Sequence, residues 1–199
     1  MIDWVTAVIP CDHDPSKLMS GMVMSFDASG NNEWTINKNI TVEGSYSSKI
    51  QIKSHTDSQI WISGNPTKFL QGHNIFGTDD LKYLMGKFFD SLLKHENLGL
   101  QPTNAQYKAI QEGDYFLKRV DVNQSWHLKN REEVLAWIRS AGSCARLKHR
   151  GSGQYTGDTL YFAKNSRRWS VKCYSKGQEI NARNHKLPDE LQIPELMEW

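Results

Sequence analysis

Residues 48–93 read SKIQIKSHTDSQIWISGNPTKFLQGHNIFGTDDLKYLMGKFFDSLL and combine two kinds of hydrophobic spacing. Apolar and polar residues alternate over 48–53, and the pattern resumes at 59–62, as in half-buried strands. Over residues 81–93 the apolar residues recur at intervals of three and one, which is typical of an amphipathic helix. Thr78 is predicted to cap this helix. Strands followed by a helix favour an α+β fold.

Segments on either side of this stretch extend the pattern. A second helix is predicted over 131–141 with Asn130 as its cap. We expect an α+β domain with a central antiparallel β-sheet, solvated on one face and with helices packed on the other. This domain is predicted to span residues 1–186, and residues 187–199 are predicted to form a C-terminal helix or the start of a missing half. The further strands are predicted at 5–9, 22–26, 115–123, 159–162 and 169–174.

The composition is that of a folded protein with unevenly placed charge. Of the 199 residues 38% are hydrophobic, which is enough for a core and argues against disorder. Lys and Arg number 24 and Asp and Glu 22, but the stretch from Lys118 to Lys186 holds 15 of the basic residues and only 5 of the acidic ones. This segregation indicates a polyanionic partner.

Hydrophobic runs, the first residues and the cysteines indicate the cellular location of the protein. No apolar run approaches the roughly 18 residues that cross a bilayer, and the first residues lack the pattern of a secretion signal. The 3 cysteines show no C-x-x-C spacing, which argues against a disulfide framework and a cysteine zinc site. We therefore expect a cytoplasmic protein with no membrane partner.

The strand predicted at 115–123, expected to be central in the sheet, carries the first candidate site. Because side chains alternate along a strand, Arg119, Asp121 and Asn123 share one face, and the two valines between them are expected in the core. Carboxylate and amide oxygens suit Mg²⁺ or Mn²⁺. The alternative is that Asp121 pairs with Arg119 or a lysine on a solvated face.

Tyr174 is the second candidate. It lies where the last predicted strand gives way to a polar turn, and neighbouring cations can favour the phenolate form of a tyrosine nucleophile. The alternative is a packing residue with its hydroxyl in water. The cations closest in sequence are Arg167, Arg168, Lys172 and Lys176.

Histidines and a glutamate complete the candidate ligands. His73 lies in a loop punctuated by glycines before the first helix, where it can bind a metal or a phosphate. The alternative is a loop whose polar side chains satisfy buried backbone groups. Glu179 is either a further ligand or an ordinary acidic residue of a first helical turn. His127 is a lesser candidate, expected to be exposed.

A last set of candidates is basic. Residues 146–155 are predicted to form a loop whose cations, glycines and tyrosine suit phosphate contact and base stacking on single-stranded DNA or RNA. The alternative is a solvated loop. Trp126 and Trp137 are expected in the core or the sheet. The predicted DNA contacts are Arg119, Arg146, Lys148, Arg150, Lys164, Arg167, Arg168 and Lys172.

Three segments carry recognisable motifs, and they are residues 65–78, 119–121 and 166–179. Together they resemble the replication-initiator endonuclease of filamentous bacteriophages, the gene II protein family. Residues 65–78, NPTKFLQGHNIFGT, are similar to its K-x-L-Q-G-H-N-x-F-G-T signature. Residues 119–121 resemble its R-I-D. Ser166-Arg167 and residues 174–179 resemble the S-R and Y-x-K-x-x-E around its nucleophilic tyrosine. The opening Met-Ile-Asp also agrees.

The resemblance implies an HUH-endonuclease-like fold and a site-specific nick in the phage origin, made by Tyr174 with Lys176 as a second catalytic residue. A 5′-phosphotyrosine bond forms, the released 3′-hydroxyl primes rolling-circle synthesis, and a later transesterification rejoins the displaced strand. Tyr161, in a Y-x-x-K with Lys164, is the alternative nucleophile. The metal ligands for Mg²⁺ or Mn²⁺ are expected to be Asp121, His73, Asn123 and Glu179.

The implied partners are single-stranded or locally melted origin DNA and host replication proteins, in the host cytoplasm. The resemblance covers the N-terminal, nicking half of the family's initiators. Two other functions stay open. One is a non-catalytic single-stranded nucleic-acid-binding module in which Tyr174 stacks on bases. The other is a metal-dependent nuclease that uses activated water and forms no covalent adduct.

Overall fold

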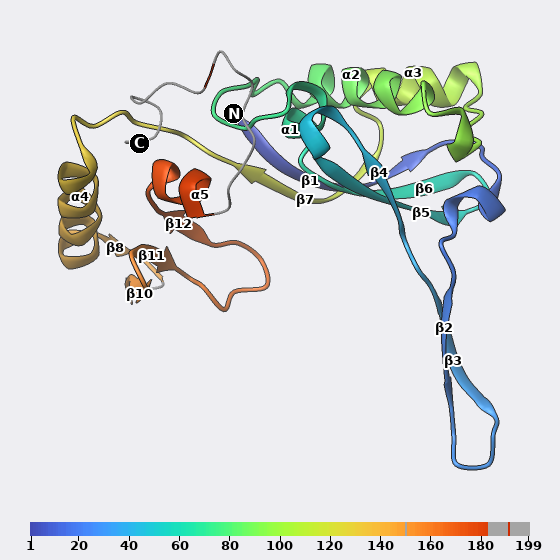
Figure 1. Ribbon diagram of the computed structural model, residues 1–199, viewed down its shortest axis with the longest axis horizontal. Helices are drawn as coiled ribbons and strands as arrows, with labels where there is room; N and C mark the ends of the chain where they lie inside the picture. The colour runs from blue at the N-terminus through green and yellow to red at the C-terminus, as the bar shows by residue number, and fades with distance from the viewer. Residues whose placement is uncertain (150, 183–190, 192–199) are drawn as a thin grey trace. The chain divides into compact units, whose positions relative to one another are not determined.

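The computed structural model describes residues 1–149, 151–182 and 191 (Figure 1). The chain divides into two compact units, Met1–Gln124 and Ser125–Trp199. The predicted boundary between residues 186 and 187 lies outside the described residues and stays a prediction. None of the described helices is long and apolar enough to cross a membrane.

The first unit is built on an antiparallel sheet, which has five strands in the order β4-β5-β6-β1-β7 among the described residues (Figure 1). In β1, Val5 lies opposite Val120 of β7 and Ala7 lies opposite Ile62 of β6. The buried side chains of Val5, Ala7 and Ile9 alternate along β1 and define the core face. The strands are β1 (Ile2–Pro10), β4 (Ile40–Glu43), β5 (Lys49–Thr56), β6 (Gln59–Gly64) and β7 (Phe116–Val122).

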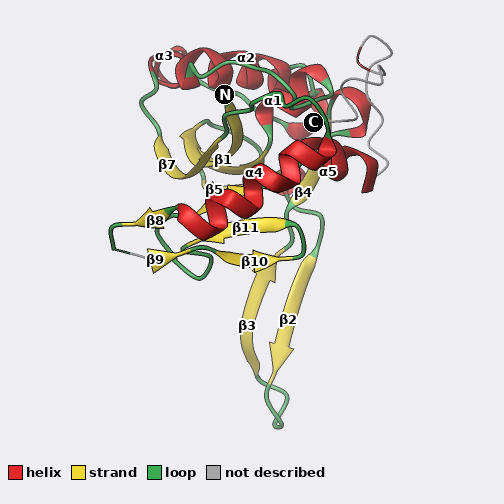
Figure 2. Cartoon of the chain, turned by 90° about the vertical axis from the view of Figure 1, so that its left-hand side faces the viewer, coloured by secondary structure: helices red, strands yellow, loops and turns green. Residues whose placement is uncertain are grey.

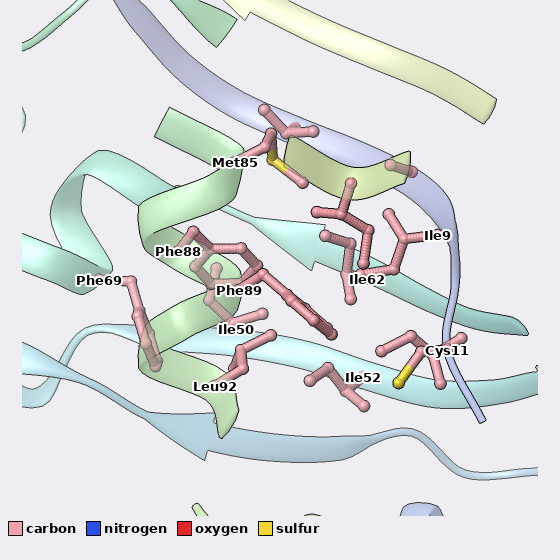
Figure 3. Packing of buried hydrophobic residues seen from close by; sticks show 14 of the residues in the cluster. Ile9, Cys11, Ile50, Ile52, Ile62, Phe69, Met85, Phe88, Phe89 and Leu92 are labelled. Carbon is pink, nitrogen blue, oxygen red and sulfur yellow. The ribbon is translucent and has the colours of Figure 1, made fainter. Parts of the chain in front are cut away.

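Helices α1 (Pro66–Gln71), α2 (Leu81–Leu93) and α3 (Asn104–Glu112) cover one face of this sheet (Figure 2). The apolar stripe of α2 faces the isoleucines of β1, β5 and β6 (Figure 3). The rings of Phe69 and Phe88 meet edge to face with their centroids 5.4 Å apart. The predicted α+β class, with an antiparallel sheet and helices on one face, is confirmed.

The predicted helix over 81–93 is confirmed, but its cap is not Thr78. Asp80 is the N-cap, since its carboxylate accepts a hydrogen bond from the Tyr83 N–H at 3.0 Å. Thr78 accepts instead from the Asp80 N–H at 3.0 Å. Helices α1 and α3 were not predicted, because α1 has 6 residues and α3 buries only Ile110 fully. Short 3-10 turns are η1 (Pro15–Leu18), η2 (Ser45–Ser47) and η3 (Glu96–Leu98).

Strands β2 (Met22–Phe26) and β3 (Asn32–Asn37) form an antiparallel ribbon that extends away from the five-stranded sheet (Figure 1). The turn at its tip is closed by Asp27, whose carboxylate accepts hydrogen bonds of 2.8 Å from the N–H groups of Ser29 and Asn31. The sequence predicted β2 but not β3, whose residues are all exposed.

The second unit packs α4 (Arg131–Cys144) on a small antiparallel sheet of order β10-β11-β12 in the described part of the chain. Its core holds Val134, Ile138, Leu160 and Phe162. The predicted helix from 131 and the predicted final hairpin are confirmed, but residues 146–155 contain short strands where a loop was expected. The remaining elements are β8 (Arg146–Leu147), β9 (Gly151–Ser152), β10 (Gln154–Thr156), β11 (Thr159–Phe162), β12 (Val171–Cys173) and α5 (Lys176–Ala182).

Candidate active site

Three segments that are far apart in sequence meet at the start of β1. The Ile2 N–H donates to the Thr78 carbonyl at 2.9 Å, and the buried Thr67 hydroxyl donates to the Ile2 carbonyl at 2.9 Å. On the β7 side, the Met1 ammonium donates to the Asn123 carbonyl at 2.7 Å, and the Asn123 N–H donates to the Met1 carbonyl at 2.8 Å. The N-terminus, the glycine-punctuated loop and the end of β7 are therefore one structural site.

Asp3 is the carboxylate that ties the loop to β1. Its Oδ1 accepts hydrogen bonds from Asn65 Nδ2 at 2.6 Å and from Asn74 Nδ2 at 2.7 Å. Asn65 also caps α1, since its Oδ1 accepts from the Lys68 N–H at 2.7 Å. Sequence reasoning did not select Asp3, although the resemblance of the opening Met-Ile-Asp pointed to it.

His73 is buried, with 6% of its surface exposed. Its Nδ1 lies 3.4 Å from the Ile75 N–H, which can only donate, and 3.3 Å from Gln71 Nε2. Its ring packs on Phe76 with the centroids 4.4 Å apart. Burial lowers the pKa of His73 from 6.5 because it penalises the imidazolium. The side chain is therefore held neutral with its remaining proton on Nε2.

Arg119 and Asp121 form a bidentate ion pair. Arg119 donates from Nε at 2.8 Å and from a terminal nitrogen at 2.5 Å, and these hydrogen bonds raise the pKa of the Arg119 guanidinium. In register, Arg119 lies opposite Thr6 and Asp121 opposite Trp4, so both belong to the sheet face that the helices leave open. Trp4, 36% exposed, places its ring 5.8 Å from the guanidinium carbon.

Two expectations about this strand are wrong. β7 is an edge strand of the described sheet and not a central one. Its valines are not in the core either, because the edge reaches past the cover of the helices, and Val120 and Val122 are 39% and 68% exposed. Asn123 lies one residue beyond the end of β7, where its backbone exchanges two hydrogen bonds with Met1. Its buried Oδ1 has no hydrogen-bond partner among the described residues.

In the second unit, Tyr174 lies between β12 and α5, outside both elements. The predicted polar turn after it is in fact a helix, because Ser175 starts a helical turn by accepting from the Glu179 N–H at 3.2 Å. Tyr174 is half-buried, and the Lys172 ammonium lies 4.0 Å from the centroid of its ring. Lys176 donates to Glu179 at 2.7 Å in an ion pair whose side chains are 14% and 19% exposed.

Tyr161, the alternative nucleophile, lies within β11 opposite Lys172. The Lys164 ammonium lies 5.2 Å from its ring centroid and donates to the Thr156 hydroxyl at 2.6 Å. Since β11 is bonded to β10 on one side and β12 on the other, the backbone of Tyr161 is fixed by both neighbours. A lysine over the ring is thus common to both tyrosines, and only Tyr174 lies outside a strand.

The predicted DNA contacts of the second unit are exposed. Arg167 and Arg168 lie in the segment between β11 and β12, and Arg146 and Lys148 lie on and beside the short β8–β9 pair. Arg150 lies outside the described residues. His127 is exposed, as expected. Trp126 and Trp137 are not in the core, since 65% and 49% of their surfaces are exposed and their rings stack 6.3 Å apart.

Residues 1–199 match the family described as the N-terminal domain of the phage replication-associated protein, the gene II protein. The chain belongs to this family. A curated relative, the replication-associated protein of Enterobacteria phage I2-2, is 40% identical over 208 residues. The alignment covers 100% of this chain and 59% of that relative, so the chain spans about three fifths of its length. No solved structure matches the chain.

Among the residues that the structure describes, the predicted ligands do not form a set that would hold a divalent ion by side chains alone. No group of three or more His, Cys, Asp and Glu residues within 1–149, 151–182 and 191 is arranged to hold a metal. The two carboxylates predicted as ligands, Asp121 and Glu179, each pair with a basic residue of the same segment. The open alternative for Asp121, pairing with Arg119, is the one that the structure contains. The metal requirement stays a prediction.

Proposed function

We propose that this chain is the origin-nicking domain of a phage replication initiator and that Tyr174 is its nucleophile. Membership of the gene II protein family supports a role in the initiation of phage DNA replication. The observation that carries the chemical assignment is the position of Tyr174 at the β12–α5 junction, with the Lys172 ammonium 4.0 Å from its ring.

The chemistry is an exchange of one phosphodiester for another. The Tyr174 oxygen attacks phosphorus, the bond from phosphorus to the 3′ oxygen breaks, and a 5′-phosphotyrosine bond replaces it. The phenol loses its proton and the leaving 3′ oxygen gains one, so neither an oxidant nor net acid is needed. Positive charge near the ring favours the phenolate, and this is the role we assign to Lys172. Because one phosphate ester replaces another and no bond is hydrolysed, the step is reversible. A 3′-hydroxyl can later attack the phosphotyrosine and rejoin a strand.

The ion pair of Lys176 and Glu179 has a different role in this proposal. Both side chains are largely shielded from water, so the pair fixes the first turn of α5 and thereby the backbone that follows Tyr174. Removing one partner would leave a shielded charge uncompensated. Lys176 is therefore assigned to positioning Tyr174, and Glu179 to holding Lys176.

Single-stranded origin DNA is the proposed substrate. The exposed arginines between β11 and β12 supply phosphate contacts beside the nucleophile in sequence. On the first unit, the open sheet face offers the exposed indole of Trp4, which suits stacking on an unpaired base. Host replication proteins are proposed to act after the nick, on the free 3′-hydroxyl.

A covalent-adduct gel tests the proposal. The purified chain is incubated with a labelled single strand carrying the phage origin, with Mg²⁺, with Mn²⁺ and with neither. Wild type is expected to give a protein–DNA band that survives denaturation, Tyr174→Phe none, and Tyr161→Phe a band close to that of wild type. An adduct that persists in Tyr174→Phe and vanishes in Tyr161→Phe would transfer the assignment to Tyr161. A band of equal strength without added ion and with chelator would contradict the metal requirement.

The exposed tryptophan pair favours a second candidate, a non-catalytic single-stranded nucleic-acid-binding module. Trp126 and Trp137 stack on each other at the surface of the second unit, an arrangement that can extend to a base. This candidate predicts binding without any adduct. Cleavage without an adduct, unaffected by Tyr174→Phe, would instead indicate a nuclease that uses activated water.

A further inference from the structure

The β2–β3 ribbon exposes large apolar side chains on both of its faces. Cross-strand pairing places Met22, Met24 and Phe26 on one face and Val23, Trp34 and Ile36 on the other. Between 40% and 57% of each of these six surfaces is exposed. Scattered apolar residues are ordinary on a protein surface, but six on one protruding ribbon mark a contact surface.

The charges of the ribbon argue against nucleic acid as its partner. Residues 22–37 contain no Lys or Arg, and their charged residues are Asp27 and Glu33. A phosphate backbone is bound mainly by cations, which this ribbon lacks. The surface is therefore suited to protein.

The edges of the ribbon are also open to pairing. In the described part of the chain, β2 and β3 pair only with each other, so each strand has an outer edge with unpaired backbone groups. Natural edge strands are commonly protected by Lys or Pro, and neither occurs between residues 22 and 37. This ribbon lacks both residue types, and its irregularity in register lies near the tip, between Ser25 and Phe26.

The distribution of charge along the ribbon favours a second copy of the same ribbon as its partner. Glu33 and Asp27 lie at the tip, whereas Lys38 lies at the base, where its N–H donates to the Gly21 carbonyl at 2.8 Å. Two identical ribbons laid side by side in opposite directions would bring the acidic tip of each to Lys38 of the other. A two-fold arrangement of this kind is self-complementary in charge, as an isologous dimer requires.

We infer that the β2–β3 ribbon is a dimerisation arm, which pairs antiparallel with the same ribbon of a second copy of this chain. Six half-exposed apolar side chains offer on the order of 500 Å² of apolar surface per copy. The six side chains lie on two faces, so one partner ribbon covers only part of this area, and the arm contributes part of the roughly 800 Å² per partner of a standard interface. The pairing covers apolar groups that otherwise contact water.

Sedimentation equilibrium of the 199-residue chain over a concentration series tests the arm. Wild type is expected to dimerise, and Trp34→Ser is expected to raise the dimer dissociation constant by about tenfold or more. Trp137→Ser is the matched control, since Trp34 and Trp137 are 47% and 49% exposed and the chemical change is the same. The control is expected to leave the dissociation constant within about twofold of wild type.

Exchanging the charges of Lys38 and Glu33 tests whether the partner is a second copy of this chain or a different molecule. Lys38→Glu alone and Glu33→Lys alone each place like charges together twice in the dimer, so each is expected to be monomeric where wild type is dimeric. An equimolar mixture of the two single variants is expected to form a heterodimer, and the Lys38→Glu/Glu33→Lys double variant to recover dimerisation. These rescues also exclude loss of folding as the cause.

Two results would overturn the inference. One is a wild-type chain that stays monomeric at concentrations well above those of the nicking assay. The other is a dimer that Trp34→Ser and the single charge variants leave intact, which would place the interface elsewhere. If the chain were monomeric and Trp34→Ser weakened DNA binding, the ribbon would be a DNA contact and the dimer model would be wrong.

Discussion

One carboxylate at the start of β1 organises the loop that carries His73. Asp3 Oδ1 accepts from two asparagine amides, and one of these asparagines caps α1. Asp3→Ala leaves both amide donors without this acceptor, so we expect a loss of about 2 kcal/mol in the free energy of unfolding. Urea unfolding of the purified chain measures this loss.

Asp3→Asn distinguishes the hydrogen bonds of Asp3 from its charge. An amide oxygen can accept both bonds at the same position, so Asp3→Asn should recover more than half of the stability that Asp3→Ala loses. If Asp3→Asn were as unstable as Asp3→Ala, the negative charge near Arg119 would matter more than the two hydrogen bonds.

His73 makes the stability of the first unit depend on pH. Its pKa in the folded chain is below 6.5, so the unfolded chain binds more protons as the pH falls through this range. The stability contributed by neutral His73 is complete above pH 6.5 and is lost as the pH falls toward the folded pKa. Wild type should therefore lose more stability than His73→Asn between about pH 7.5 and about pH 5, as measured by urea unfolding. Parallel pH profiles for the two proteins would contradict this role.

Among the elements, α2 contributes most of the aromatic core. Phe88 is 1% exposed and meets Phe69 edge to face, whereas Tyr83 on the outer side of the same helix is 58% exposed. Phe88→Ala removes a buried ring and leaves a cavity, so we expect a loss of about 3–5 kcal/mol in the free energy of unfolding.

Tyr83→Ala is the control for the same helix. It loses no buried contact with the core, and the expected loss is below about 1 kcal/mol. Thermal and urea unfolding of both variants provide the comparison. Similar losses for the two would mean that helix propensity, and not burial against the sheet, determines the stability of this element.

For the whole molecule, the uneven charge is the main feature that bears on DNA. Arg167 and Arg168 are exposed in the segment that precedes β12. Replacing both with Ala should weaken binding to single-stranded DNA and reduce the slope of log affinity against log salt by about 1.4, because each phosphate contact contributes about 0.7. Fluorescence anisotropy with a labelled oligonucleotide over a salt series measures the slope.

Lys108→Ala is the control for this effect. Lys108 lies on α3 in an exposed ion pair with Glu112 at 3.7 Å, outside the basic third of the chain. This variant should leave the slope unchanged. If Lys108→Ala and the double arginine variant reduced the slope equally, DNA affinity would depend on the total charge of the chain and not on the basic stretch.

Elements with a local signal could be predicted from the sequence. Spacing along the chain shows which side of an element meets the core. It therefore predicted the helix over Leu81–Leu93, the cap at Asn130 and the strands of the final hairpin. It also determined the candidates Tyr174, Asp121 and His73, through side-chain chemistry and resemblance to a family. Of these three, Tyr174 is the residue on which the proposed function rests.

Which distant residues become neighbours could not be predicted from the sequence and became clear from the folded chain. Strand order put β7 at an edge and exposed its valines, and the pairing of β7 with β1 joined Asp121 and Arg119 to the face of Trp4. The grouping of Asp3 with Asn74 is absent from any local pattern. The hydrogen bonds at the start of β1 join residues 62 to 122 positions apart, and periodicity within about ten residues cannot relate residues at such distances.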